Sequence, residues 1–247
     1  MKGLIMIDIH SHILFAVDDG AVDLAESMAL IADSYQQGVR TIIVTPHKRK
    51  NMFEATNTQI SENFSVLKHA IQQQYPDLKL YLGNEIYYTS DVFTKLKQKN
   101  YFTLAETNFV LVEFAYESTY QEIYTAIREI LSLGLRPVLA HVERYDALAL
   151  HKERFFELRE LGCLIQINAA SVLPAKLFND PLKVFKKRTQ FCLKADLVDF
   201  VASDVHHLDQ RKNYLQAAYQ QIQKKYGTQR AQDLFEMNQK KILLERD

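Results

Sequence analysis

Short apolar runs rich in β-branched residues alternate along the chain with longer runs in which apolar residues recur every three or four positions. The short runs predict seven β-strands: Leu4–His10, Arg40–Thr45, Leu78–Gly83, Phe109–Phe114, Pro137–His141, Cys163–Asn168 and Phe200–Asp204. Strands that alternate with helices are typical of parallel βαβ units. Seven such units without a long antiparallel stretch favour a closed or nearly closed α/β barrel, although an open sheet is also compatible with the pattern.

The longer runs predict amphipathic helices between these strands. In the first of them, four apolar residues follow the spacing of a single buried face: Leu24, Met28, Ile31 and Tyr35. Asp23 can cap its first turn, with Glu26 three residues later, and Gly38 can adopt the left-handed conformation that ends it. The same spacing predicts two further helices, one through Ile60, Phe64, Leu67 and Ile71 and one through Ile123, Ile127 and Ile130.

Composition narrows the class of protein. The 247 residues contain no linker-like stretch, so we expect one domain over 1–247. Thirty basic and 30 acidic residues cancel, which leaves no net charge to attract nucleic acid or anionic membrane. No segment has the pattern of a secretory signal or of a membrane span, and the two cysteines, Cys163 and Cys192, lie in apolar surroundings. We therefore expect a cytoplasmic protein with reduced core thiols.

Asp8 and His10 end the first predicted strand and alternate with Ile5, Ile7 and Ile9, and His12 follows at the same spacing. Because side chains alternate across a strand, we expect the isoleucine face to pack on helices and the polar face to point into the barrel. Buried polar groups are costly unless they pair with each other or with a metal ion. For a His-x-His pattern on its own, a pair of hydrogen-bonded core histidines is the simpler interpretation.

Residues of the types that bind metal recur at the ends of the other predicted strands. They are His47, Glu85, Glu113, His141, Asp204 and His206. The C-terminal ends of parallel barrel strands converge on one face, where the active sites of barrel enzymes form. Glu113 is especially informative because it lies between Val112 and Phe114, and a buried glutamate needs a cation nearby. These positions predict a metal centre at the ends of the strands.

The candidate ligands define the chemistry of that centre. Asp18, Asp19 and Asp23 precede a predicted helix and have a second interpretation as helix caps. With Asp19 included, the ligand set is His10, His12, Asp19, His47, Glu85, Glu113, His141, Asp204 and His206. Imidazoles and carboxylates without a thiolate suit Mn, Fe, Zn or Mg, and so large a set indicates more than one ion. Such a site suits hydrolysis of a phosphate ester. The other histidines, His69, His151 and His207, are interpreted as surface or structural residues.

The motifs that carry these residues occur in a recognisable order: His10-x-His12, Asp18-Asp19-Gly20, Thr45-Pro46-His47, Gly83-x-Glu85, Glu113-Phe114, Ala140-His141-x-Glu143-Arg144-Tyr145 and Ala202-Ser203-Asp204-x-His206. Together they resemble the polymerase-and-histidinol-phosphatase (PHP) superfamily of metal-dependent phosphoesterases. More narrowly, they resemble its bacterial protein-tyrosine phosphatases, which are associated with capsule and exopolysaccharide synthesis. The resemblance covers essentially the whole chain. It implies a single domain with a distorted (β/α)7 TIM-like barrel and a centre of three divalent ions, commonly Mn²⁺.

The resemblance also implies roles for individual residues. One ion would be held by His10, His12, Glu85 and Asp204, a second by Glu85, Glu113 and His141, and a third by Asp19, His47 and His206. Arg144 and Arg211 match the basic residues that grip the phosphate, and for Arg211 the alternative is an ordinary residue in the first turn of a solvated helix. The run Lys48-Arg49-Lys50 could meet acidic residues of a peptide, although a solvated loop is the simpler interpretation.

The implied substrate is the phosphotyrosine-containing tail of a membrane-associated bacterial tyrosine kinase that regulates capsular polysaccharide synthesis. A hydroxide that bridges the metal ions would attack phosphorus, and Asp8 would orient a ligating imidazole from behind. Cysteine phosphatases instead place an arginine six residues after the nucleophile. Here Ala169 and Val198 occupy those positions after Cys163 and Cys192, so the reaction is expected to depend on metal.

Two other functions are compatible with the same residues. The first is a sibling PHP activity, either histidinol-phosphate hydrolysis or a polymerase-associated nuclease, and the balanced charge weighs against the nuclease. The second is a non-catalytic protein that binds a phosphorylated tail. The complete ligand set weighs against it, because a site that no longer turns over its substrate has usually lost at least one ligand.

Overall fold

The strands form two parallel sheets. The computed structural model describes all residues except 1–4, 177 and 246–247. One sheet has the order β1 (Met6–Asp8), β2 (Val39–Val44), β4 (Lys79–Leu82). The other has the order β3 (His47–Lys48), β5 (Glu85–Tyr87), β6 (Phe109–Glu113), β7 (Arg136–Leu139), β8 (Leu164–Asn168), β9 (Phe200–Ala202). Each of the seven predicted strands is present with slightly different bounds, except that Leu4 lies outside the described residues.

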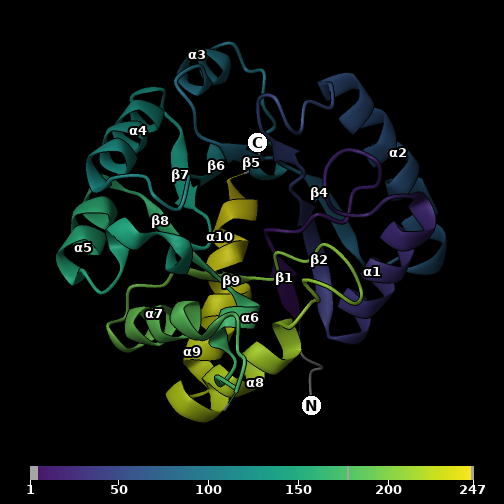
Figure 1. Ribbon diagram of the computed structural model, residues 1–247. Coiled ribbons are helices and arrows are strands. Elements are labelled where there is room, and N and C mark those ends of the chain that lie inside the picture. Colours follow the sequence, from purple (N-terminus) through teal and green to yellow (C-terminus); the bar gives the residue numbers. More distant parts are fainter. Residues whose placement is uncertain (1–4, 177, 246–247) are drawn as a thin grey trace.

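Backbone hydrogen bonds join the two sheets at both ends. The Glu85 N–H donates to the Pro46 carbonyl where β4 and β2 continue, after short breaks, into β5 and β3. At the other end, the Asp204 N–H donates to the His10 carbonyl at 2.9 Å, and the His12 N–H donates to the Val205 carbonyl at 2.9 Å. The chain is therefore a mixed α/β domain around a curled parallel sheet, as Figure 1 shows.

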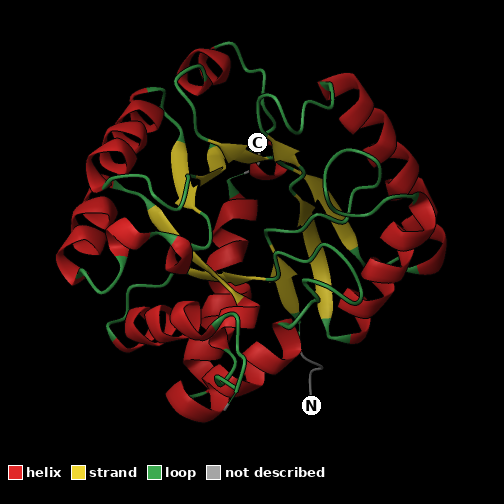
Figure 2. Cartoon of the chain, in the orientation of Figure 1, coloured by secondary structure: helices red, strands yellow, loops and turns green. Residues whose placement is uncertain are grey.

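Most helices cover the outside of this curled sheet (Figures 1 and 2), whereas the C-terminal helix lies within the ring of strands and its Ile242 shares a core cluster with Ile7 and Ile9. The α-helices are α1 (Leu24–Gln36), α2 (Asn57–Gln74), α3 (Val92–Lys97), α4 (Tyr120–Ser132), α5 (Lys152–Leu161), α6 (Ala169–Val172), α7 (Lys183–Lys194), α8 (Leu215–Tyr226), α9 (Thr228–Gln232) and α10 (Asn238–Leu244). Short 3₁₀ segments are η1 (Leu104–Glu106), η2 (Val142–Arg144) and η3 (Asp146–Leu148), and η4 (Asp233–Met237) is a π-helical turn. Among the described residues, no helix is both long and apolar enough to cross a membrane.

The first helix confirms its predicted ends and corrects its predicted face. The Asp23 side chain caps α1 by accepting a hydrogen bond from the Glu26 N–H at 2.9 Å, and Gly38 has a φ of 101°. The residues of α1 that are buried are Ser27, Leu30, Ile31 and Ser34, whereas Leu24, Met28 and Tyr35 are only partly buried. The buried face is therefore rotated toward Ser27 and Ser34, whose hydroxyls donate to the Ile13 and Leu30 carbonyls.

The predicted orientation of the first strand is wrong. In the pairing of β1 with β2, Asp8 is the partner of Ile42, which belongs to the core cluster that the helices cover. Ile7 and Ile9 belong instead to the inner cluster with Leu111 and Phe200. The strand ends at Asp8, so its alternation cannot be extended to His10 and His12, which lie in the irregular segment that follows.

Asp8 is therefore a structural residue, and its removal should destabilise the fold. Its fully buried carboxylate accepts hydrogen bonds from the Ser203 N–H at 3.0 Å and the Ser203 hydroxyl at 2.5 Å. Asp8→Ala leaves these donors buried without an acceptor, so we expect the free energy of unfolding to fall by about 3 kcal/mol. Urea denaturation measures this change, with exposed Glu117→Ala as the control. A loss below about 1 kcal/mol would contradict the structural role.

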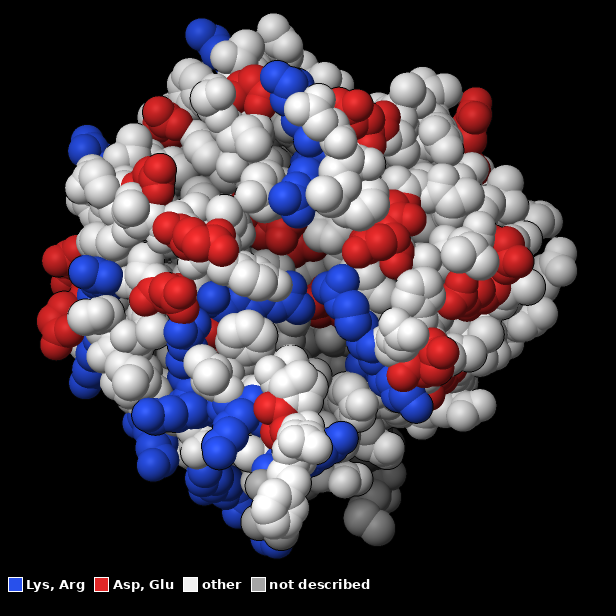
Figure 3. All heavy atoms as spheres, in the orientation of Figure 1, with Lys and Arg blue, Asp and Glu red and all other residues white. Residues whose placement is uncertain are grey.

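Surface charge is mixed over most of the face in Figure 3, in keeping with the neutral composition. Lys and Arg side chains nevertheless gather at the lower left of that view, where α7 lies in Figure 1. Of the exposed basic residues in α7, Lys183 and Lys187 are in its first half. The chain thus has a locally basic surface that its net charge conceals.

Candidate metal centre

Eight of the nine side chains predicted as metal ligands lie at the end of a strand, at a short break between two strands, or in the segment that follows a strand. His10 and His12 follow β1, His47 and Glu85 begin β3 and β5, Glu113 ends β6, His141 follows β7, and Asp204 and His206 follow β9. Asp19 lies in the loop before α1 and has the only half-exposed side chain among the nine. The structure brings eight of them together in three overlapping groups that could hold metal: His10, His12, Glu85 and Asp204; His12, Asp19, His47 and His206; and His47, Glu85 and Glu113.

The first group has the spacing of ligands around a single ion. The Nε2 atoms of His10 and His12 are 3.3 Å apart, and each is 3.2 Å from Glu85 Oε2 and 3.5 Å from Asp204 Oδ1. Ligands bound at about 2.1 Å in a tetrahedron are about 3.4 Å from one another. The four side chains are therefore already arranged as the corners of a coordination shell.

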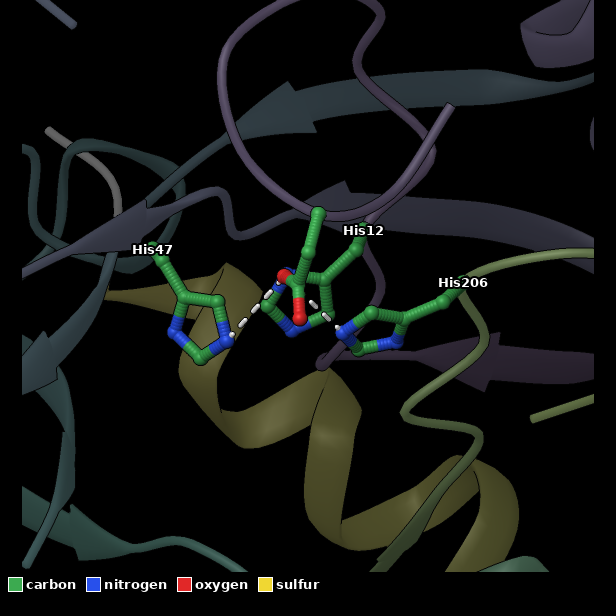
Figure 4. A group of neighbouring side chains, drawn as sticks. His12, His47 and His206 are labelled. Carbon is green, nitrogen blue, oxygen red and sulfur yellow. Dashed lines mark ion pairs between the residues drawn. The ribbon is translucent and has the colours of Figure 1, made fainter. Parts of the chain in front are cut away.

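The second group surrounds the exposed carboxylate of Asp19. Figure 4 shows the rings of His12, His47 and His206 turned toward one another, with ion pairs drawn to a common carboxylate. Asp19 Oδ1 lies 3.5 Å from His47 Nε2 and 3.4 Å from His206 Nε2. Gly20 makes this loop possible, because a Cβ there would lie 2.0 Å from the His12 carbonyl oxygen.

Glu85 and Glu113 both lie close to His47 and to His141. His47 Nδ1 is 3.1 Å from Glu85 Oε2 and 3.2 Å from Glu113 Oε1. His141 Nε2 is 2.7 Å from Glu85 Oε1 and 3.7 Å from Glu113 Oε2. The ring of His47 thus faces both the second group and the third, a position that the sequence did not reveal.

Unpartnered polar atoms show that these residues fit metal ions. Four buried side-chain atoms in the cluster make no hydrogen bond: His47 Nδ1, Glu85 Oε2, Glu113 Oε1 and His206 Nε2. Each of these four atoms faces other candidate ligand atoms of the cluster. Their lone pairs therefore point toward one another, and too few hydrogen-bond donors lie between them to satisfy all of them. A divalent cation satisfies such a convergence, and imidazole with carboxylate is a donor set that Mn, Fe and Zn accept.

The electrostatics of the cluster depend on its buried carboxylates. Burial opposes the charged form of His10 and His47, but the negative charge of Glu85 outweighs this effect. With Asp204 it raises the pKa of His10 to about 9, and with Glu113 it raises the pKa of His47 to about 10. Burial and the neighbouring His12 lower the pKa of His206 to about 4. The carboxylates therefore require positive charge close to them, which either protons or metal ions can supply.

Two residues orient the histidines, and the sequence interpretation missed both. Gln166 Oε1 lies 3.1 Å from His10 Nδ1 and accepts a hydrogen bond from the His141 N–H at 2.9 Å. Asp18 Oδ2 lies 2.8 Å from His12 Nδ1 and accepts from the His47 N–H at 2.8 Å. Asp18 is thus not a helix cap. Asp8 does not hydrogen-bond to an imidazole ring: its carboxylate accepts from Ser203 and from the His10 backbone N–H. The sequence signal that could have identified Gln166 is its position as a polar residue inside the otherwise apolar strand β8.

Removing Asp18 should weaken metal binding. Partners that fix a ligating imidazole are usually worth about 10- to 100-fold in metal affinity, so we expect a loss of that size for Asp18→Ala. Metal titration by calorimetry on the metal-free protein measures it. Asp23→Ala is the matched control from the same loop, because Asp23 only caps α1 and its loss should leave the affinity unchanged. Equal affinities in the two variants would disprove the orienting role of Asp18.

The two predicted arginines converge on one ligand. Arg144 donates to Asp204 Oδ2 at 2.6 Å, and Arg211 donates to Asp204 Oδ1 at 2.8 Å and to Oδ2 at 2.9 Å. Although burial opposes ionisation, Arg144 and Arg211 hold the pKa of Asp204 well below its usual range. The helical alternative for Arg211 is wrong, since α8 begins at Leu215 and Arg211 has a left-handed φ of 50°.

The remaining predicted residues lie outside the cluster. His69 and His151 are exposed, and His207 pairs with Glu26 at 2.8 Å, as a surface or structural interpretation requires. Cys163 and Cys192 are buried free thiols, and burial raises the pKa of Cys192 to about 12. In the basic run, Lys48 donates to the Ala55 carbonyl and Arg49 stacks on Tyr87.

Comparisons with known proteins support a hydrolytic role for such a site. The family model described as capsular polysaccharide synthesis, CpsB/CapC, matches residues 6–244. The chain is 49% identical over 238 residues to the tyrosine-protein phosphatase CpsB of Streptococcus agalactiae serotype V, covering 96% of this chain and 98% of that protein. It is 47% identical over 240 residues to the Streptococcus pneumoniae protein of the same name, with 97% and 99% covered.

A solved structure resembles the whole chain. It comes from work on YwqE from Bacillus subtilis and CpsB from Streptococcus pneumoniae, described as unique metal-dependent tyrosine phosphatases. The TM-score is 0.83 at 30% sequence identity, and the match covers 98% of this chain and 94% of that chain. The likeness extends over the strands that carry the cluster.

Proposed function

The chain belongs to the CpsB/CapC family of capsular polysaccharide synthesis, and on this basis we propose that it is a metal-dependent protein-tyrosine phosphatase. The observation that carries the proposal is the cluster of eight imidazole and carboxylate side chains, with His141 2.7 Å from Glu85, next to two arginines. Relatives that are nearly half identical over almost their full length are named tyrosine-protein phosphatases. The fold that supports this function is a single PHP domain over 1–247, a distorted (β/α)7 barrel.

In this proposal the cluster binds three divalent ions, and the proposed metal is Mn²⁺. His10, His12, Glu85 and Asp204 would hold the first ion, and Asp19, His47 and His206 would hold the third. Glu85 would also serve the second ion, together with Glu113 and His141. The spacing of the first group and the convergence of three histidines on Asp19 support the first and third assignments. The second is supported by the distances of 2.7 and 3.7 Å from His141 Nε2 to Glu85 and Glu113, and His47 Nδ1 lies within 3.2 Å of the same two glutamates.

The chain's own residues bind and orient the phosphate. When bound, the metal ions supply Lewis acidity and lower the pKa of water enough to provide a nucleophile near neutral pH. Arg144 and Arg211 turn their guanidinium groups toward Asp204 at the edge of the cluster, where they can form paired hydrogen bonds with a phosphate. Gln166 and Asp18 contact four of the histidine ligands and hold them in place. Tyrosinate leaves with little assistance, since a phenol has a pKa near 10.

No cysteine takes part in the proposed reaction. A thiolate nucleophile must be exposed and have a lowered pKa. Cys163 and Cys192 are both buried, and burial raises the pKa of each. This agrees with the absence of an arginine six residues after either cysteine.

The proposed substrate is the phosphotyrosine tail of a membrane-associated bacterial tyrosine kinase, and the proposed role is regulation of capsular polysaccharide synthesis. The family description supports the role in capsule synthesis. The basic side chains over α7 suit an acidic, phosphorylated segment. We place the reaction in the cytoplasm, where two free thiols such as Cys163 and Cys192 remain reduced.

A substrate panel tests the proposal. Purified protein loaded with Mn²⁺ is given a phosphotyrosine peptide, a phosphoserine peptide and histidinol phosphate, and the release of phosphate is measured. We expect the phosphotyrosine peptide to be hydrolysed at least about 100-fold more efficiently than the others, a difference of about 3 kcal/mol in transition-state binding. Faster turnover of histidinol phosphate would favour the sibling PHP activity. Tight binding of the peptide without turnover would favour a non-catalytic role.

A further inference from the structure

A cavity of about 470 Å³ opens beside the metal-ligand cluster. Its polar floor consists of Arg144, Asn168, Asp204 and Arg211. Its walls carry aromatic and aliphatic side chains, among them Tyr116 and Phe185. The cavity is therefore amphipathic, with charged groups next to the cluster and apolar groups farther out.

The floor is organised around Asp204. Asn168 donates to Asp204 Oδ2 at 2.6 Å, and the two arginines donate to the same carboxylate. These three donors already converge on oxygen atoms, as they would on a phosphate next to the metal ions. The substrate's phosphate should therefore lie at this end, and whatever carries the phosphate must extend into the rest of the cavity.

The wall is aromatic and held in place. The rings of Tyr116 and Phe185 lie edge to face, with centroids 6.4 Å apart and planes inclined by 67°. Phe185 belongs to α7, and Arg188 in the same helix donates to the carbonyls of Glu143 and Arg144 at 3.2 and 3.3 Å. The same helix thus fixes the aromatic wall relative to the arginine on the floor.

We propose that this cavity binds the phenyl ring of the phosphotyrosine, with Tyr116 and Phe185 as the residues that determine specificity for aryl phosphates. The inference rests on the proposed function and names a part of its substrate site. A phenyl ring holds its phosphate farther from the peptide backbone than the single carbon of serine does, so only phosphotyrosine spans from the floor past the wall. The open edge of Tyr116, which is 46% exposed, is available for a third ring.

Binding of two phosphonates tests the inference without turnover. Phenylphosphonate and methylphosphonate share the anionic group and differ in the ring, and calorimetry on the Mn²⁺-loaded protein gives both affinities. We expect phenylphosphonate to bind about 10-fold more tightly to the unmodified protein, and Tyr116→Ala and Phe185→Ala to reduce this ratio to about 2 or less. Tyr116→Phe, which keeps the ring, should retain the ratio. Phe156→Ala, in α5 and outside the cavity, is the control for loss of a surface aromatic residue.

Each outcome decides between the alternatives. The inference is overturned if the unmodified protein binds phenylphosphonate and methylphosphonate with nearly equal affinity. It is also overturned if the alanine variants leave the ratio of the two affinities unchanged. If both phosphonates weaken equally in the variants, the wall acts only by positioning Arg144, and the inference is also overturned. If the ratio behaves as expected while the phosphotyrosine peptide is not hydrolysed, the ring subsite stands and the proposed phosphatase function fails.

Discussion

Glu85→Gln is expected to lower hydrolysis of the phosphotyrosine peptide by about 10³-fold or more, equivalent to about 4 kcal/mol of transition-state stabilisation. Glu85 Oε2 lies within 3.2 Å of ring nitrogens from three histidines, His10, His12 and His47. In the proposed site it is the ligand shared by two ions. The amide has nearly the same shape but no charge, and it can bind a metal ion only weakly through its oxygen.

Two measurements on this variant separate a metal defect from a folding defect. Elemental analysis should show less bound metal per chain, while circular dichroism should show an unchanged helix content. Glu129→Gln is the matched control, because Glu129 accepts a hydrogen bond from Tyr88 away from the cluster and its loss should leave turnover within about 2-fold. Full activity in Glu85→Gln would exclude Glu85 as a bridging ligand and with it the proposed metal arrangement.

Removal of metal by a chelator is expected to abolish turnover and to lower the melting temperature by about 10 °C. The first effect follows because the proposed nucleophile is a metal-activated water and neither buried thiol can replace it. The second follows from linkage: an ion present at about 1,000 times its dissociation constant stabilises the folded state by about 4 kcal/mol, and each kcal/mol is worth about 2–4 °C at this chain length. Activity assays and differential scanning calorimetry before and after dialysis measure both.

The double variant Cys163→Ser, Cys192→Ser serves as the control for this experiment. It should keep its turnover within about 3-fold and keep its dependence on metal, since neither thiol reaches the cluster. Return of activity on adding Mn²⁺ to the chelated protein should accompany return of the melting temperature. Persistent activity in protein shown to be free of metal would refute a metal-dependent mechanism.

Much of the fold was predictable because its determinants are local. Apolar spacing located the strands from Phe109 to Glu113 and from Phe200 to Ala202 to within two residues. Capping located the start of α1, where the interaction between Asp23 and the Glu26 N–H spans three residues. The short strands β3 and β5 were missed, since each has only two or three residues and depends on pairing with the other.

Predictions of the direction in which a side chain points failed where the backbone is irregular. Strand alternation assigned Asp8 to the inner face, but β1 ends at Asp8 and pairs it with Ile42 on the outer side. His141 and Asp204 have left-handed φ angles of 34° and 52°, which no spacing rule anticipates. Such backbone conformations direct side chains of neighbouring strand ends toward one another.

The sequence by itself determined the residue types of the cluster and their positions at strand ends, because parallel strands bring their C-terminal ends to one edge whatever the details of packing. Only the tertiary structure decided which atoms face each other. It placed Glu85 among three imidazoles, Gln166 behind His10, and Phe185 beside Tyr116, in contacts that join segments between 38 and 156 residues apart. Contacts of that kind depend on side-chain rotamers and backbone turns set by the packed core, and no local pattern in the chain encodes them.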